Sequence, residues 1–439
     1  MKAIETLIHP DCVICVDNDN QVLENHSLAI HEGVIVDILP TTETHQKYTA
    51  KNVHALPGQV VIPGLINCHT HAPMNLFRGL ADDLPLMQWL EQHIWPAEQQ
   101  WVDADFVRDG TRLAIAEMLR SGTTCFNDMY FFPDIVAEQA KSVGIRASIG
   151  LIVIDFPTVW ANSAKEYIDK GLRLHDALQG EPLLTTAFAP HAPYTVSDEP
   201  LTELTRLAAE KDISIHMHIH ETAGEITMAM EQTGQRPLQR LEELGVLSEK
   251  LMAVHMTQLT NEEISLLAAQ GCHVLHCPES NLKLASGFCP VQSLLDAGVN
   301  VALGTDGVAS NNDLDMLGEM RTAALIAKAV SNDAQAVDAN TVLRMATING
   351  ARALGIDSVT GSLEIGKSAD ITAIRLDSLE TQPLYDAVSQ LVYAAGREHV
   401  TNVWVAGKHL LVDRKLAGMD ERELVETAKR WQVRIATHH

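Results

Sequence analysis

The sequence predicts an α/β protein centred on a TIM-like (β/α)₈ barrel, with a small discontinuous β domain built from both chain ends. Eight apolar runs rich in β-forming residues recur between residues 59 and 305, and each precedes an amphipathic helical stretch. Parallel barrel strands are buried on both faces and therefore read as continuous apolar runs. The flanking segments lack this alternation. We expect domain boundaries at 1–58, 59–364 and 365–439.

The amino-terminal segment is all-β in character. Strands are expected at Thr6–Val16, Ser27–His31 and Gly33–Leu39, because these segments lack helical periodicity and are separated by turn residues. The carboxyl-terminal segment has the same strand-like pattern. We expect strands at Asp370–Arg375 and Val400–Val405 and a final helix at about 420–436.

The central segment supplies the barrel. Its expected strands lie near 59–69, 122–128, 145–153, 183–190, 214–220, 251–256, 272–277 and 300–305. Its expected helices lie near 86–120, 132–142, 160–178, 199–211, 235–245, 261–270, 290–297 and 313–329.

Composition excludes several classes of function. The 32 basic and 57 acidic residues give a net charge of −25, which argues against nucleic acid and against an anionic membrane as partners. The sequence contains no run of about 18 apolar residues, so we expect no membrane span. The amino terminus does not have the pattern of a signal peptide. The seven scattered cysteines favour a reducing, cytoplasmic setting. A homo-oligomer is left open.

The stretch from Val60 to His71 reads as one buried strand that ends in two histidines. Side chains two apart on a strand share a face, so His69 and His71 could together bind a transition metal. Among 20 histidines such a pair can arise by chance, and further ligands are needed.

Further polar residues follow the other expected strands. A one-metal site needs three or four nitrogen or oxygen ligands and one open position, which His69, His71, a strand-5 histidine and Asp306 could supply. The alternation of side chains along a strand places three strand-5 histidines on one face, so it does not identify which of them is the ligand. Asp306 could also take a proton from a bound water, and Glu221 could carry a proton to the substrate. The other polar positions at or near strand ends are His191, His216, His218, His220, His255 and His276.

These motifs resemble the amidohydrolase superfamily. The resemblance rests on PGLINCHTH at 63–71, the H-x-x-E of His218 and Glu221, His255, Asp306, and GSLEIGKSAD at 361–370. It implies that the terminal segments form a β-sandwich and that His218 is the third metal ligand. Glu221 would be the acid/base, His255 would assist the attacking water, and Asp306 would be ligand and base. No lysine occurs in 183–191, which favours the subtype with one metal, zinc by default, with Fe²⁺ or Mn²⁺ as alternatives.

The residues from His71 to Glu98 are similar to those of 5-methylthioadenosine/S-adenosylhomocysteine deaminases. The resemblance implies that Glu98 holds the ribose hydroxyls and that His191 contacts the purine, with Glu221 and Asp306 also facing the substrate. The implied reaction is hydrolytic deamination of the adenine ring to the inosyl product and ammonia by metal-activated water. Arg146 receives no role.

Two rival functions remain. Another one-metal amidohydrolase, such as a guanine, cytosine or triazine-type deaminase or a chlorohydrolase, would share the metal site but would have no ribose for Glu98 to hold. A catalytically inactive scaffold is disfavoured because every expected ligand is present. The preference among methylthioadenosine, S-adenosylhomocysteine and adenosine is left open.

Overall fold

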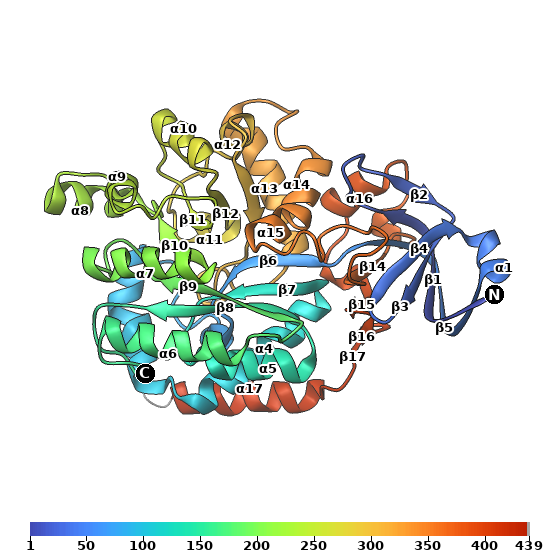
Figure 1. The fold of residues 1–439 in the computed structure, drawn as a ribbon, viewed down its shortest axis with the longest axis horizontal. Coiled ribbons are helices and arrows are strands. Elements are labelled where there is room, and N and C mark those ends of the chain that lie inside the picture. Colours follow the sequence, from blue (N-terminus) through green and yellow to red (C-terminus); the bar gives the residue numbers. More distant parts are fainter. Residues whose placement is uncertain (437–439) are drawn as a thin grey trace.

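Two sheets organise the structure, a computed structural model that describes residues 1–436 (Figure 1). Eight strands pair in parallel, each with the next along the chain, and form the barrel. The predicted fold class is confirmed. The strands are β6 (Leu65–Thr70), β7 (Thr123–Asp128), β8 (Arg146–Val153), β9 (Leu184–Pro190), β10 (Ser214–Ile219), β11 (Leu251–His255), β12 (His273–His276) and β13 (Asn300–Leu303).

Helices follow the barrel strands and cover the outside of the barrel (Figure 1). The main ones are α4 (Ala104–Arg120), α5 (Pro133–Val143), α6 (Ala164–Ala177), α7 (Asp198–Lys211), α8 (Ala223–Thr233), α9 (Pro237–Glu243), α10 (Asn261–Gln270), α11 (Pro278–Lys283), α12 (Val291–Asp296) and α13 (Met316–Ser331). Beyond them lie α14 (Ala339–Met345), α15 (Ile348–Ala353) and α16 (Ala387–Tyr393).

The expected helix at 86–120 is divided into shorter pieces. After the 3₁₀ turn η2 (Ala72–Phe77), the chain forms α2 (Leu86–Trp89), a π-helical turn η3 (Leu90–Ile94), α3 (Trp95–Trp101) and then α4. Pro96 lies at the start of α3, where its missing N–H costs little, and Asp103 caps α4 by accepting the Phe106 N–H. The cap at Asp103 begins α4 as a helix separate from α3.

The barrel closes between its first and last strands through a glycine. The Asp306 N–H donates to the His69 carbonyl of β6 over 3.0 Å. Beside it, the Asn67 side-chain amide donates to the Thr305 hydroxyl, and the Asn67 side-chain oxygen accepts the Thr305 backbone N–H. A Cβ on Gly304 would lie 2.7 Å from the His69 nitrogen, so only glycine permits this approach. The closure brings Asp306 beside His69.

The second sheet draws its nine strands from both ends of the chain (Figure 1). Its centre is the parallel pair β1 and β5, and β5 pairs antiparallel with β14 from the carboxyl-terminal part. The domain boundaries at 58 and 364 stay a prediction. The strands are β1 (Lys2–Ile14), β2 (Val22–Glu24), β3 (His26–His31), β4 (Val34–Pro40), β5 (Tyr48–Pro63), β14 (Ile371–Arg375), β15 (Val400–Val405), β16 (Lys408–Val412) and β17 (Lys415–Leu416).

The expectation of one strand from Val60 to His71 is wrong. Gly64 divides this stretch, so that Val60–Pro63 belongs to β5 of the second sheet and Leu65 begins β6 of the barrel. A Cβ on Gly64 would lie 2.0 Å from the Thr124 hydroxyl oxygen, which explains the glycine at the crossing. Both sheets bury this segment, and the apolar pattern therefore runs through the boundary.

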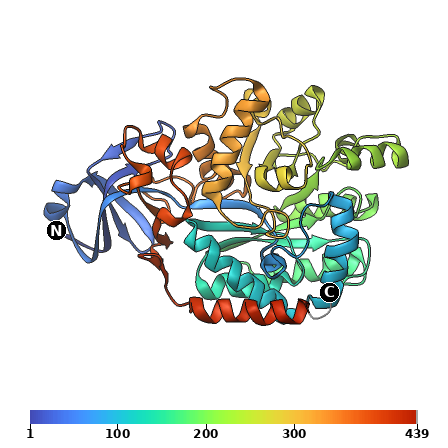
Figure 2. The ribbon, with the colours of Figure 1, turned by 180° about the vertical axis from the view of Figure 1, so that it is seen from behind.

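The carboxyl-terminal helix α17 (Glu421–Ala436) lies along the barrel beside α4 (Figure 2). The Trp431 indole N–H donates to Asp109 of α4 over 3.0 Å, and Arg120 pairs with Glu421 at 2.8 Å. Within residues 1–436, no helix has the length and apolar character needed to cross a membrane.

Candidate metal centre and active site

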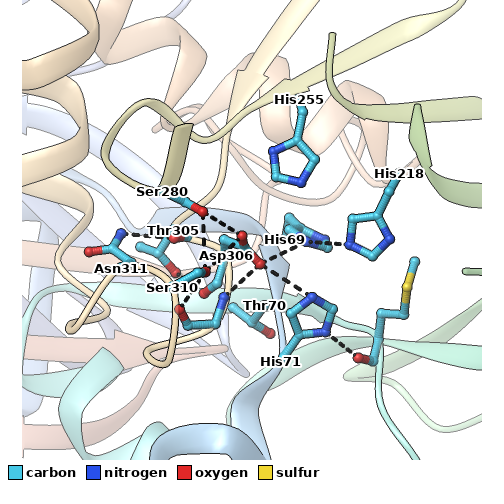
Figure 3. A network of polar contacts seen from close by, with 12 residues as sticks. His69, Thr70, His71, His218, His255, Ser280, Thr305, Asp306, Ser310 and Asn311 are labelled. Carbon is cyan, nitrogen blue, oxygen red and sulfur yellow. Dashed lines mark hydrogen bonds and ion pairs between the residues drawn. The ribbon is translucent and has the colours of Figure 1, made fainter. Parts of the chain in front are cut away.

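Three imidazoles and one carboxylate meet at the carboxyl ends of the barrel strands (Figure 3). His69 and His71 come from β6 and the segment after it, His218 from β10, and Asp306 follows β13. The Nε2 atoms of His69 and His71 each lie 3.2 Å from Asp306 Oδ1, and His218 Nε2 lies 3.2 Å from His69 Nε2. All four ligand atoms lie within 4.8 Å of one another, which suits a single divalent metal.

The other ring nitrogens of the three histidines are all engaged away from this centre. Backbone carbonyls only accept, so the Nδ1 atoms of His71 and His218 must donate, and their Nε2 lone pairs are free for a metal. The Nδ1 contacts are His69 to His216 Nε2 at 2.9 Å, His71 to the Met129 carbonyl at 2.6 Å, and His218 to the His191 carbonyl at 2.6 Å. This arrangement fits a zinc-type site.

Asp306 is held by both of its oxygens. Oδ1 faces the imidazoles and accepts the Gly307 N–H, while Oδ2 accepts the Ser280 and Ser310 hydroxyls at 2.6 and 2.9 Å. Burial opposes the charge on Asp306, but His69 and His71, which hydrogen-bond to it while their Nε2 atoms carry protons in place of a metal, outweigh burial and hold the pKa of Asp306 well below the usual range. Asp306 is therefore ionised and oriented before any ligand binds.

Three site residues have left-handed backbone conformations. His220, His255 and Asp306 have φ values of 54°, 74° and 64°, at the points where β10, β11 and β13 end. Such values are uncommon for residues other than glycine and mark positions that the surrounding structure over-determines. The turns at His255 and Asp306 place their side chains in the cavity, and the turn at His220 precedes Glu221, which also lines it.

Glu221 and His255 face each other across the site. Glu221 Oε1 lies 3.8 Å from His255 Nε2, and His255 Nδ1 contacts Asn281 Oδ1 at 2.8 Å. Burial raises the pKa of Glu221, which favours the protonated acid that a proton donor needs. The buried Glu225 of α8 accepts the backbone N–H groups of His220 and Glu221 at 3.0 and 2.7 Å and so fixes the turn that carries Glu221.

A cavity of about 520 Å³ opens directly onto this centre. Three of the four residues of the metal group, all but His69, line it, as do the expected acid/base and substrate residues. Apolar and aromatic side chains near the mouth complete the lining. Its volume suits a ligand of nucleoside size.

Glu98 projects from α3 into the cavity and is half-buried. Burial raises the pKa of Glu98 to about 7, against opposing effects of the Tyr130 hydroxyl and of His71. His191 also lines the cavity, and burial lowers its pKa to about 3, so its ring is neutral near pH 7. Its Nδ1 contacts the Thr195 hydroxyl at 3.1 Å.

The structure separates the histidines that alternation could not. His218 meets the metal group, His216 lies behind His69, and His220 turns away and accepts the Leu238 N–H at 3.3 Å. Arg146 lies at the opposite end of β8, where it pairs with Asp370 at 2.9 Å, and does not line the cavity. His276 is buried at the end of β12 and its Nδ1 has no partner among the described residues.

Sequence reasoning did not identify Ser280, Ser310 or Glu225. Ser280 and Ser310 follow β12 and β13 by a few residues. Their position shortly after a strand end was the sequence signal that could have identified them. Glu225 lies three residues after Thr222, whose side chain caps α8, and the capping pattern alone does not show what Glu225 holds.

Comparison with known proteins agrees with this geometry. The amidohydrolase family model matches residues 60–410. A 5-methylthioadenosine/S-adenosylhomocysteine deaminase from Teredinibacter turnerae is 50% identical over 415 residues, covering 94% of each chain. A zinc-bound adenosine deaminase structure from Xanthomonas campestris has a TM-score of 0.98 at 53% identity, covering 99% of each chain. A zinc-bound atrazine chlorohydrolase from Arthrobacter aurescens has a TM-score of 0.89 at 25% identity, covering 97% of this chain and 99% of that one.

Proposed function

The chain belongs to the amidohydrolase family and, within it, to the 5-methylthioadenosine/S-adenosylhomocysteine deaminases, and we propose that it hydrolytically deaminates the adenine ring of such nucleosides. The products are the inosyl compound and ammonia. The observation that carries the proposal is a single cavity that joins the three-histidine, one-aspartate centre to Glu98. A centre for water activation and a carboxylate suited to a vicinal diol are what a nucleoside deaminase requires.

One Zn²⁺ per chain is the proposed cofactor, held by His69, His71, His218 and Asp306. The bound metal supplies Lewis acidity that lowers the pKa of water towards neutrality. The nitrogen and oxygen ligands also permit Fe²⁺ or Mn²⁺.

Four residues would carry out the proton transfers and hold the substrate. Asp306, ionised and fixed by two hydroxyls, takes a proton from the attacking water as the water adds to C6 of adenine. Glu221, whose raised pKa favours the acid form, gives its proton to the ring nitrogen. His255, steadied by Asn281, orients the water, and His191 contacts the purine. Asp306 then passes the proton it received to the amino group, which leaves as ammonia, and Glu221 takes the proton of the hydroxyl at C6 as the carbonyl forms.

Glu98 would bind the ribose. An ionised carboxylate accepts hydrogen bonds from both hydroxyls of a vicinal diol, and Glu98 faces the same cavity as the metal group. Because this role needs a ribose, Glu98 separates a nucleoside deaminase from enzymes that act on free bases or triazines.

A substrate screen tests the proposal. Purified chain loaded with zinc is incubated with adenosine, 5′-methylthioadenosine, S-adenosylhomocysteine, adenine, guanine, cytosine and atrazine, following ultraviolet absorbance and ammonia release. Ammonia and loss of adenine absorbance with the nucleosides support the proposal. Turnover of free bases or atrazine with no turnover of any adenine nucleoside contradicts it.

We also propose a cytoplasmic location. All seven cysteines are buried free thiols. Such an arrangement suits a reducing compartment.

A further inference from the structure

The turns that follow β10 and β11 are hydrogen-bonded to each other beyond the ends of the two strands. The backbone N–H groups of Met256 and Thr257 donate to the two carbonyls that precede Glu221, over 3.2 and 3.0 Å. The Thr257 hydroxyl donates to the Glu221 carbonyl over 2.7 Å, and this carbonyl is the nearest of the three within its reach. The segment that directly follows His255 thus holds the turn that carries Glu221.

The N–H side of the same turn is held from α8. Glu225 Oε1 accepts the His220 N–H at 3.0 Å, and Glu225 Oε2 accepts the Glu221 N–H at 2.7 Å. The N–H of Glu225 itself donates to the Thr222 hydroxyl that caps α8, which ties Glu225 to the start of the helix. Both backbone groups of Glu221 are therefore bound by buried side chains from two different elements.

These two side chains do not reach the substrate cavity. Glu225 and Thr257 are buried, and neither lines the cavity into which Glu221 and His255 project. The turns that they join have left-handed conformations at His220 and His255, which persist only where the surrounding structure holds them. Loss of a contact would allow the Glu221 carboxyl group to move away from its position 3.8 Å from His255.

From these contacts we propose that Glu225 and Thr257 are positioning residues that together form a clamp and fix the Glu221 carboxyl group against His255. The inference rests on the proposed function, in which Glu221 transfers protons at the adenine ring. Displacement of a reacting group by about 1 Å can lower the rate about 10²-fold. The clamp therefore acts mainly on kcat, because metal and substrate are held chiefly by other residues.

Two substitutions of Thr257 test the clamp with the adenine nucleoside that the chain turns over fastest. Thr257→Val retains the shape of the side chain and leaves the Glu221 carbonyl without its hydroxyl donor, whereas Thr257→Ser retains the hydroxyl. We expect kcat of the valine variant to fall about 10- to 100-fold, with KM and zinc content within about twofold of the parental values. The serine variant should recover most of the lost rate.

The other outcomes are equally defined. A valine variant with the parental kcat overturns the inference, and so does a serine variant as slow as the valine variant, because the hydroxyl would then have no part. A loss of zinc and of thermal stability that parallels the loss of rate would show a structural role only.

The start of α6 offers a matched control for Glu225. Glu166 and Glu225 are each the third residue of a helix, donate their N–H to the capping hydroxyl and accept a backbone N–H from the preceding turn. Glu166 holds Asn162, which does not line the cavity. A glutamine has one acceptor oxygen in place of two, so Glu225→Gln should lower kcat about tenfold or more, and Glu166→Gln should leave it within about twofold. Equal losses in the two variants would overturn the assignment.

A double variant shows whether the clamp acts through Glu221. In a Glu221→Gln background, Thr257→Val should lower kcat no further, because the group that it positions is already inactive. Multiplication of the two separate losses would overturn the inference. Turnover by the parental chain together with an unaffected Thr257→Val variant refutes the clamp alone. If the parental chain deaminates no adenine nucleoside, the proposed function fails, and the inference fails with it.

Discussion

The inner and outer halves of the cavity are built in opposite ways. At the inner end, Asp306 and the metal-site histidines each have a second partner that fixes their orientation. At the outer end, the side chains beside Glu98 are apolar and Phe156 and Val159 are partly exposed. The contrast indicates that the chemistry depends on fixed polar geometry, whereas the range of substrates depends on surfaces that can change without disturbing the centre.

The largest expected effect comes from removing the charge at the inner end. Asp306→Asn retains the shape of the side chain but cannot take a proton, so kcat should fall by about 10³-fold or more even where metal is bound. Activity and metal content are measured on the same sample. Substantial turnover by the metal-containing variant would contradict the role of Asp306 as base.

The closure that carries Asp306 can be broken sterically. In Gly304→Ala the new Cβ would press on the His69 backbone, so we expect the free energy of unfolding to drop by about 1–3 kcal/mol and metal to be lost. Gly224→Ala is the control, because its Cβ would meet only the Thr222 hydroxyl at 3.5 Å. Thermal unfolding and metal analysis should distinguish the two variants, and an equal effect would refute the steric argument.

Glu98, where the two halves meet, should control pH dependence. Its pKa of about 7 means that the ionised form, which under the proposal accepts hydrogen bonds from the ribose diol, is lost as the pH falls through about 7. We therefore expect kcat/KM for adenosine to decline below pH 7, about tenfold per pH unit once protonation dominates.

The matched variant is Glu98→Gln, which cannot ionise. Its kcat/KM for adenosine near pH 8 should be about 10- to 100-fold lower, and the part of the acid limb that Glu98 causes should disappear. Adenine, which lacks ribose, should be affected less. Equal losses of kcat/KM for adenosine and adenine would contradict the role of Glu98 in binding the ribose.

The smallest effect is expected at the outer rim. Phe156→Ala should lower kcat/KM for methylthioadenosine about threefold to tenfold and leave the rate with adenosine less affected, because adenosine has no methylthio group to cover. The ratio of the two substrates is the readout. A parallel loss with both would show that Phe156 supports the fold of the loop rather than the 5′ substituent.

Much of the inner half could be predicted from the sequence. Continuous apolar runs located the barrel strands to within a few residues at most ends, and the polar residues after those runs included the four of the metal group. The exception was the first strand, where an apolar pattern common to two sheets concealed the break at Gly64.

The rest depends on tertiary contacts that no local pattern encodes. Strand alternation left three histidines on one face of β10, and only barrel curvature and the turn at His220 separate His218 from the other two. Trp95 of α3 and Phe156 of the loop after β8 lie far apart in the sequence and meet only in the folded chain. The outer half of the cavity was therefore beyond sequence reasoning.

The central claim is hydrolytic deamination by this centre, and product analysis in heavy-oxygen water tests it most directly. With the zinc-loaded chain and 5′-methylthioadenosine, we expect one heavy oxygen at C6 of the inosyl product and one ammonia released per product. Recovery of unchanged nucleoside, or a product in which the glycosidic or thioether bond is cleaved and the amino group retained, would contradict the account.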